Sequence, residues 1–263
     1  MAKREQRLRG RRIVVTGSTE HGGRLAGRLR ALGAEVVELP LIRVVPDVDV
    51  EAAKEVFTEI GQYEWIVFTS ANGVRHFFEV FFRQFEDIRA LGLMRIAAIG
   101  DGTAEAIRSL RLKVDVIPEQ AVAEDLGEAL AAEQTLDNVR ILVITGNRNR
   151  DALLKRLGKE RAIVDALRVY RSETADLAKH PAARDFRERG ADALVFASAS
   201  AVTAFGEQAA HLALKRGAKV PLLCSFGPVT SRRMAEAKIP VAVEASTPGV
   251  DAMAEALVAK LGG

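Results

Sequence analysis

Short apolar runs rich in β-branched residues alternate with stretches of helical periodicity along most of the chain. The runs begin near residues 12, 34, 64, 95, 113, 140, 162, 192, 221 and 240, and they include RIVVTG, EWIVFTS, RILVITG and DALVFAS. Runs that are apolar at every position are typical of parallel strands buried on both faces by helices. The pattern therefore predicts an α/β protein with parallel sheets flanked by helices.

Several of these runs occur twice at a nearly constant separation. IVFTSANG at 66–73 matches LVFASASA at 194–201, at a separation of 128 residues. Residues 100–130 match residues 227–257 at a separation of 127. Solenoid repeats are only about 20 to 50 residues long, so this longer period predicts a duplicated domain.

A chain of 263 residues is long enough for two domains, each with its own core. A simple tandem would divide near residue 132, where neither Pro nor Gly marks a linker. Two extended stretches, 36–48 and 165–177, occupy equivalent places in the repeat and are better linkers. If the chain crosses at both, it begins in one domain, builds the second, and returns to complete the first.

The domain boundaries that we predict follow from these two crossings. Domain 1 is expected to be discontinuous and domain 2 continuous, with a two-stranded linker joining them over an open cleft. The predicted ranges are 1–40 and 175–263 for domain 1, 46–165 for domain 2, and 41–45 and 166–174 for the linker.

Composition favours a protein of the reducing cytoplasm. No apolar stretch follows the basic N-terminus to form a signal peptide, and no run approaches the roughly 20 apolar residues of a membrane span. A single cysteine, Cys224, cannot form an internal disulfide. The net charge is +3, but tyrosine and tryptophan are scarce, so a base-stacking surface is poorly supported. We expect neither a nucleic acid nor a membrane as partner.

Small polar residues follow the predicted strands in both halves of the repeat. Ligands of open parallel sheets bind at these strand ends, where Ser, Thr and Asn cap helices and backbone N–H groups meet anions. Any one such residue is also an ordinary helix cap, so the interpretation depends on their repetition. Two such rows could hold a large ligand with several carboxylates or phosphates. The stretches are 16–18, 69–73, 100–103, 145–147, 197–200 and 227–230.

Other motifs support no specific chemistry. GDGTAEA at 100–106 is a weak nucleotide-loop signal, and no GxxxxGK[ST] loop or G-x-S-x-G elbow occurs. The four histidines are scattered without metal-ligand spacing, so we predict no metal site and interpret them as surface or packing residues. Five phenylalanines at helical spacing favour core or interdomain packing. They are Phe77, Phe78, Phe81, Phe82 and Phe85.

Seven stretches, taken in order, carry a family resemblance: VVELPLIRVVP, VFTSANGV, IAAIGDGTAEAI, ILVITGNRNRDALLKRL, LRVYRS, LVFASASAV and FGPVTSRRMAEAKIPVAVEASTPGVDAMAEAL. None is diagnostic alone. In this order, with a tyrosine in the second linker, they resemble the uroporphyrinogen-III synthase family from Arg12 to Leu261.

The resemblance implies a two-domain lyase that closes the linear tetrapyrrole hydroxymethylbilane to uroporphyrinogen III. The reaction inverts the last pyrrole ring and releases water, as a step of porphyrin and heme biosynthesis. The eight carboxylates of the substrate fit rows of helix N-termini. The resemblance also implies no metal and no organic cofactor, and we expect a monomer.

Site residues are carried over by position. Tyr170 matches the linker tyrosine of the family and is the expected catalytic residue, a neutral phenol that assists the departing hydroxyl. Without the family, the same residue would be interpreted as a linker tyrosine packing on a strand. The expected substrate contacts are Thr16, Thr69, Ser70, Ala71, Asn72, Gly73, Thr103, Arg150, Ser198, Ala199, Ser200, Gly227 and Thr230.

The chain departs from the family pattern in two places. Gly17 stands where the family commonly has an arginine, so a carboxylate partner is either missing or supplied by Arg24 or Arg43. The basic N-terminal tail is extra, and the resemblance assigns it no role.

Two other functions stay open from the residues alone. A two-domain anion-binding or sensor protein without catalysis would show the same duplicated pattern. A nucleotide-dependent enzyme using the GDG loop is weakened because the acidic ribose partner is absent after a first strand.

Overall fold

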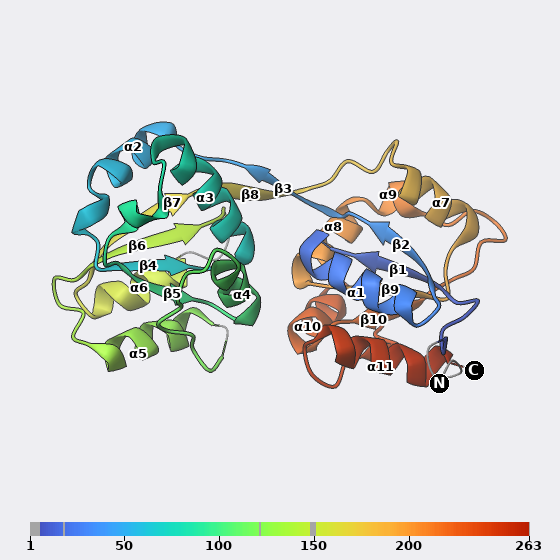
Figure 1. The fold of residues 1–263 in the computed structure, drawn as a ribbon. Helices are drawn as coiled ribbons and strands as arrows, with labels where there is room; N and C mark the ends of the chain where they lie inside the picture. The colour runs from blue at the N-terminus through green and yellow to red at the C-terminus, as the bar shows by residue number, and fades with distance from the viewer. Residues whose placement is uncertain (1–5, 18, 121, 148–150, 263) are drawn as a thin grey trace. The chain divides into compact units, whose positions relative to one another are not determined.

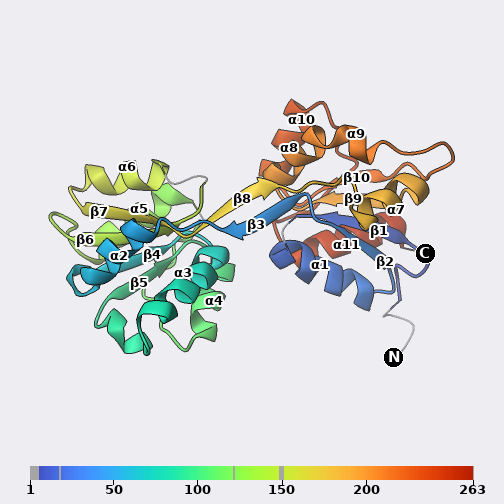
Figure 2. The same cartoon turned by 90° about the horizontal axis from the view of Figure 1, so that it is seen from above.

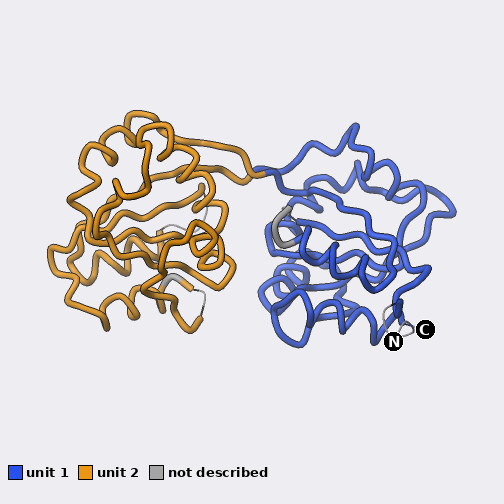
Figure 3. The backbone as a smooth tube through the Cα atoms, viewed as in Figure 1, with its two compact units in different colours: residues 1–43, 173–263 blue, residues 44–172 orange. Residues whose placement is uncertain are grey.

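The chain folds into two compact units, which are described separately. The computed structural model describes residues 6–17, 19–120, 122–147 and 151–262. Unit 1 combines Met1–Arg43 with Glu173–Gly263, and unit 2 is the continuous segment Val44–Ser172 (Figure 3). Unit 1 is therefore assembled from the two ends of the chain.

Unit 2 is built on a parallel four-stranded sheet in the order β5-β4-β6-β7. Side chains of its central strands alternate between two buried clusters, because successive residues of a strand point to opposite faces. Ile66 and Phe68 enter one cluster, while Trp65 and Val67 enter the other. The strands are β4 (Trp65–Phe68), β5 (Arg95–Ala98), β6 (Arg140–Thr145) and β7 (Ile163–Arg168).

Helices cover both faces of this sheet (Figure 1). α2 (Val50–Thr58), α3 (Ala71–Gln84) and α4 (Asp101–Ser109) pack on one face, and α5 (Ala123–Glu133) and α6 (Asp151–Lys159) pack on the other. Two 3₁₀ turns, Ile60–Gln62 and Ile88–Leu91, complete the unit.

The phenylalanine cluster predicted for packing lies on α3 and at its end. Phe77, Phe78 and Phe81 are buried in the core of unit 2 and form edge and tilted ring contacts with one another. The prediction of core packing is confirmed for these three, whereas Phe82 is 46% exposed.

Unit 1 repeats the arrangement with a five-stranded parallel sheet in the order β11-β10-β9-β1-β2. Helices cover both faces here as well. The strands are β1 (Arg12–Thr16), β2 (Glu35–Leu39), β9 (Ala193–Phe196), β10 (Leu222–Ser225) and β11 (Val243–Glu244). The helices are α1 (Thr19–Ala31), α7 (Pro181–Arg189), α8 (Ala199–Glu207), α9 (Ala209–Leu212), α10 (Pro228–Glu236) and α11 (Val250–Leu261).

Strand register confirms the duplication residue by residue. In unit 2, Val67 lies opposite Ala97 on one side and Val143 on the other. In unit 1, Val195 lies opposite Cys224 and Val15. Val195 and Cys224 are the residues 128 and 127 positions after Val67 and Ala97, so the sequence repeat is a repeat of the sheet itself.

The outermost predicted strand of each unit is shorter than the sequence indicates. The run at 113–118 forms only an isolated bridge between Val116 and Ala97, and the run at 240–245 pairs only over Val243–Glu244. Both lie at a sheet edge, where a strand has hydrogen-bond partners on one side only, and Pro118 follows the first run closely. The expectation of a full strand at 113–118 is therefore wrong.

The two chain crossings between the units pair with each other. β3 (Ile42–Pro46) and β8 (Tyr170–Thr174) form a separate two-stranded sheet (Figure 2). In the part of the chain that the structure describes, no helix is both long and apolar enough to cross a membrane.

Candidate active site

Tyr170 lies at the start of β8, within unit 2, where its ring is half-buried against the core. Its hydroxyl oxygen is 2.9 Å from Oγ of Ser70, and the two groups share a hydrogen bond. The ring lies so close to Gly146 that a Cβ at that position would be only 2.5 Å from Cζ of the ring. Gly146, which directly follows β6, thus leaves the space that the Tyr170 ring occupies.

Ser70 caps the N-terminus of α3. Its Oγ accepts a hydrogen bond from the backbone N–H of Gly73 at 3.0 Å. Uncapped N–H groups and the aligned peptide dipoles make such a helix start positive. Tyr170 is therefore connected through one serine to a helix N-terminus that favours negative charge.

The matching position in unit 1 has the same local geometry. Ser198 caps α8, and its Oγ accepts from the N–H of Ala201 at 3.2 Å. The φ and ψ angles are −163° and 156° at Ser70 and −163° and 160° at Ser198. The Oγ of Ser198 also shares a 3.0 Å hydrogen bond with Ser200 instead of a phenol.

His76 lies behind the phenol. Its ring stacks on that of Tyr170 with centroids 6.1 Å apart, and its Nδ1 lies 2.8 Å from a carboxylate oxygen of Glu79. The residue is buried, with 5% exposure. His76 is thus a packing histidine, in agreement with the sequence interpretation, and it packs on the expected catalytic residue.

Asn147 fixes the backbone of β8 next to the phenol. Its amide nitrogen donates to the carbonyl of Ser172 at 3.2 Å, and its amide oxygen accepts from the N–H of Ser172 at 2.9 Å. Two bonds to one residue hold the strand in register two positions from Tyr170. The half-buried ring consequently has support from its own backbone, from Gly146 and from His76.

Several other expected contact residues are already engaged by the fold. Thr16 is fully buried and donates to the carbonyl of Val195, and Thr69 donates to the carbonyl of Ile144. Thr103 and Thr230 are 5% and 6% exposed. These four residues lie at strand ends and first helical turns, as expected; Thr16, Thr103 and Thr230 are buried, and Thr69 is partly exposed.

The remaining expected contacts lie at helix starts. Ala71 and Asn72 open α3, and Asn72 accepts a hydrogen bond from Arg75. Ala199 and Ser200 open α8, and Gly227 precedes α10 with a φ of 159°. Arg150 lies outside the described residues.

The backbone explains the departure at Gly17. Its φ is +129°, a conformation that side chains with a Cβ rarely adopt, and an added Cβ would lie 3.1 Å from Cβ of Ala197. An arginine would be strained at this position. Arg43, one of the suggested replacements, forms an ion pair with Glu173.

Two residues beside the phenol were not singled out from the sequence. Gly146 was included only as part of a polar strand end, and His76 only as a scattered histidine. The contact of Gly146 is recognisable only from the course of β8, which returns across the end of β6. His76 lies on the face of α3 that the apolar spacing predicts to be buried, but that spacing does not indicate which residue its ring contacts.

Comparison with known proteins assigns the chain to a family. A family model described as uroporphyrinogen-III synthase HemD matches residues 23–255. The uroporphyrinogen-III synthase of Synechococcus elongatus is 28% identical in an alignment of 258 residues that covers 95% of this chain and 95% of its own. The porphyrin biosynthesis protein HemD of Ruminiclostridium josui is 30% identical over 198 residues, which are 75% of this chain but only 39% of that longer protein.

Solved structures agree in fold. The uroporphyrinogen-III synthetase of Helicobacter pylori aligns over 95% of this chain and 99% of its own, with a TM-score of 0.63 and 16% identity. A mutant uroporphyrinogen III synthase of Thermus thermophilus aligns over 94% and 96%, with a TM-score of 0.58 and 18% identity. At such identities these likenesses show the fold alone. Since the family model covers most of the residues, the chain belongs to the uroporphyrinogen-III synthase family.

Proposed function

We propose that this chain closes hydroxymethylbilane to uroporphyrinogen III, with inversion of the last pyrrole ring and loss of water. Family membership supports the reaction, and the observation that carries the catalytic assignment is the hydrogen bond between Tyr170 and Ser70. The sensor alternative, which lacks catalysis, gains no support from the related proteins.

Much of the bond chemistry belongs to the substrate. Electron-rich pyrroles expel the benzylic-type hydroxyl and form an azafulvene, which the last ring attacks at its substituted carbon. The resulting spiro intermediate fragments and recloses with that ring inverted. Uncatalysed closure attacks the unsubstituted carbon and gives the symmetric type I isomer. The protein must therefore position the ring, an effect that can contribute several kcal/mol, and help the hydroxyl depart.

The hydrogen-bond direction at Ser70 determines what Tyr170 can donate. Either hydroxyl can donate in this pair, and in our proposal Oγ of Ser70 accepts from the N–H of Gly73 and donates its own hydrogen to the phenol oxygen. In that arrangement the O–H of Tyr170 is free to donate to the departing hydroxyl, and the positive N-terminus of α3 polarises the hydrogen bonds that run from Gly73 through Ser70 to Tyr170. General-acid assistance of this kind contributes about 100-fold or more.

We further propose that substrate carboxylates bind the capped starts of α3 and α8 and the start of α10. Ser70, Ala71, Asn72 and Gly73 would act in unit 2, partly through backbone N–H groups. Ser198, Ala199, Ser200 and Gly227 would act in unit 1. The buried Thr16, Thr103 and Thr230 and the partly exposed Thr69 would act by shaping these helix starts. We also propose that the protein works as a cytoplasmic monomer.

Product analysis tests the proposal directly. Freshly generated hydroxymethylbilane is supplied, the products are oxidised, and uroporphyrin isomers I and III are separated. Type III in proportion to the amount of protein is the expected result. Type I alone, at the rate of a protein-free control, would refute the activity.

A further inference from the structure

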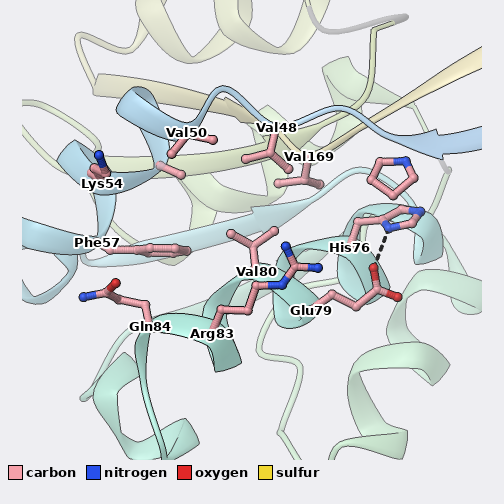
Figure 4. A pocket seen from close by; sticks show the side chains of 12 residues that line it. Val48, Val50, Lys54, Phe57, His76, Glu79, Val80, Arg83, Gln84 and Val169 are labelled. Carbon is pink, nitrogen blue, oxygen red and sulfur yellow. Dashed lines mark hydrogen bonds and ion pairs between the residues drawn. The ribbon is translucent and has the colours of Figure 1, made fainter.

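Unit 2 contains a pocket of about 380 Å³ formed by the segment that follows β3, by α2 and by α3 (Figure 4). The walls are mostly apolar and include Val48, Val50, Phe57, Val80 and Val169. A volume of this size suits a small organic molecule, and apolar walls with a few polar groups are typical of ligand sites. The lining extends over α2 and along the body of α3, whereas the proposed substrate contacts lie at helix starts.

The charged groups of the pocket are not equivalent. Glu79 is hydrogen-bonded to His76, and Lys54 forms an ion pair with Glu51 at 2.9 Å. Arg83 has no ion-pair or hydrogen-bond partner among the residues that the structure describes, and Figure 4 shows its side chain running beside Val80 into the pocket. One cation beside an apolar surface complements one anionic group on an apolar body.

We propose that this pocket binds a small molecule with a flat apolar body and a single carboxylate, which pairs with Arg83. A linear chain of four pyrroles is too large for it, so the pocket is not a second copy of the proposed substrate site. The proposal therefore does not depend on the reaction assigned to Tyr170.

His76 joins this pocket to the expected catalytic residue. It lines the pocket and stacks on the ring of Tyr170. A bound ligand consequently changes the surroundings of a residue in contact with Tyr170. The chain has only two tyrosines, Tyr63 and Tyr170, so fluorotyrosine labelling gives two ¹⁹F resonances, which a Tyr63→Phe variant assigns.

Affinity measurements test the ligand class. Indole-3-acetate is titrated by calorimetry against its neutral analogue indole-3-acetamide. The acid is expected to bind about tenfold more tightly, and Arg83→Gln should remove that preference. Arg108→Gln is the matched control, because Arg108 is also an exposed arginine in the last turn of a helix of unit 2. Equal binding of acid and amide to the unchanged protein, no binding of either, or equal losses in both variants would overturn the proposal.

Two further readouts locate the bound probe. Val50→Trp should block the pocket and abolish binding, while Val229→Trp, at a similarly exposed valine in the first turn of α10, should not. Saturation with indole-3-acetate should shift the ¹⁹F resonance of Tyr170. An unshifted Tyr170 resonance at saturation, or full binding by Val50→Trp, would place the probe elsewhere and refute the site. These experiments use no tetrapyrrole, so they can fail or succeed independently of the proposed reaction.

Discussion

The hydroxyl of Tyr170 shares a 2.9 Å hydrogen bond with Oγ of Ser70, although the two residues are 100 positions apart in the chain. The contact joins the first residue of a crossing strand to the cap of α3. It makes the phenol part of a helix N-terminus instead of a freely rotating side chain on a linker. The first predictions follow from this relationship.

Replacing Tyr170 by Phe should lower the rate of type III formation by about 100-fold, because the donor to the leaving hydroxyl is removed. The free energy of unfolding should fall by no more than about 1 kcal/mol, since one hydrogen bond of a half-buried group is lost. Enzyme assays and urea denaturation measure the two effects. An unchanged rate would exclude the assigned role.

Tyr63→Phe is the matched control for that variant. Burial and a 2.8 Å hydrogen bond to Asp165 raise the pKa of Tyr63, so the Tyr63 phenol is neutral at pH 7. We expect a stability loss of about 1 kcal/mol and an unchanged closure rate. A large loss of activity here would mean that tyrosine replacement disturbs unit 2 in general.

Ser70→Ala and Ser198→Ala separate capping from catalysis. Each variant loses a helix cap and should be destabilised by about 1 kcal/mol. Only Ser70→Ala also releases the phenol, so its kcat should fall by about tenfold, with a smaller effect for Ser198→Ala. Steady-state kinetics and thermal denaturation are compared. Equal values of kcat for the two variants would contradict the donor chain from α3 to Tyr170.

Gly146→Ala should inactivate the enzyme through the position of Tyr170. The new Cβ would lie 2.5 Å from Cζ of the ring, so the phenol must move away from Ser70. We expect a rate loss similar to that of Tyr170→Phe. Gly158→Ala is the control, because nothing lies within 4 Å of its Cβ and alanine favours the helix by up to about 1 kcal/mol. Retention of wild-type activity by Gly146→Ala would show that the ring does not need this position.

Acid should destabilise unit 1 partly through Asp192. Burial of this carboxyl opposes ionisation, but hydrogen bonds from Lys219 and the N–H of Arg12, and the charges of Lys219 and Arg11, hold its pKa below the ordinary 3.8. A depressed pKa stabilises the fold above pH 3.8, and that stability is lost as the pH falls through the lower, folded value.

An Asp192→Asn variant tests this linkage. It should be less stable than the unchanged protein at pH 7, and the difference should shrink as the pH falls below about 4. Urea denaturation over this pH range measures the difference in the free energy of unfolding. A difference that stays constant with pH would show that Asp192 does not titrate differently in the folded state.

Sequence patterns predicted the fold class because parallel strands buried on both faces are apolar at every position, as in RILVITG. The duplication was visible in the sequence because the strands around Val67 and Val195 keep similar residues, and these two residues hold equivalent places in the two sheets. The lengths of two edge strands were overestimated, because an apolar run such as KVDVIP does not show on how many sides it will find a neighbouring strand.

The candidate site was only partly predictable. Ser70 and Ser198 were expected at helix starts because a capping serine after an apolar run is a local signal. Tyr170 came from a family resemblance, and its contacts with Ser70, Gly146 and His76 depend on where β8 returns over unit 2. Such long-range contacts leave no periodicity in the sequence. Part of the basic N-terminus proved structural, because Arg12 belongs to β1 and Arg11 pairs with Asp192.

The discontinuous construction of unit 1 has a consequence for biosynthesis. β1 is a central strand whose partner β9 begins at Ala193, so the ribosome must translate about 180 further residues before the pair can form. Unit 2 is complete when Ser172 has left the exit tunnel. We therefore expect the inserted unit to fold first on the nascent chain, while the apolar β1 has only β2 beside it and lacks its second neighbour, β9. During that interval these N-terminal segments are the natural targets of chaperones that bind exposed apolar chain.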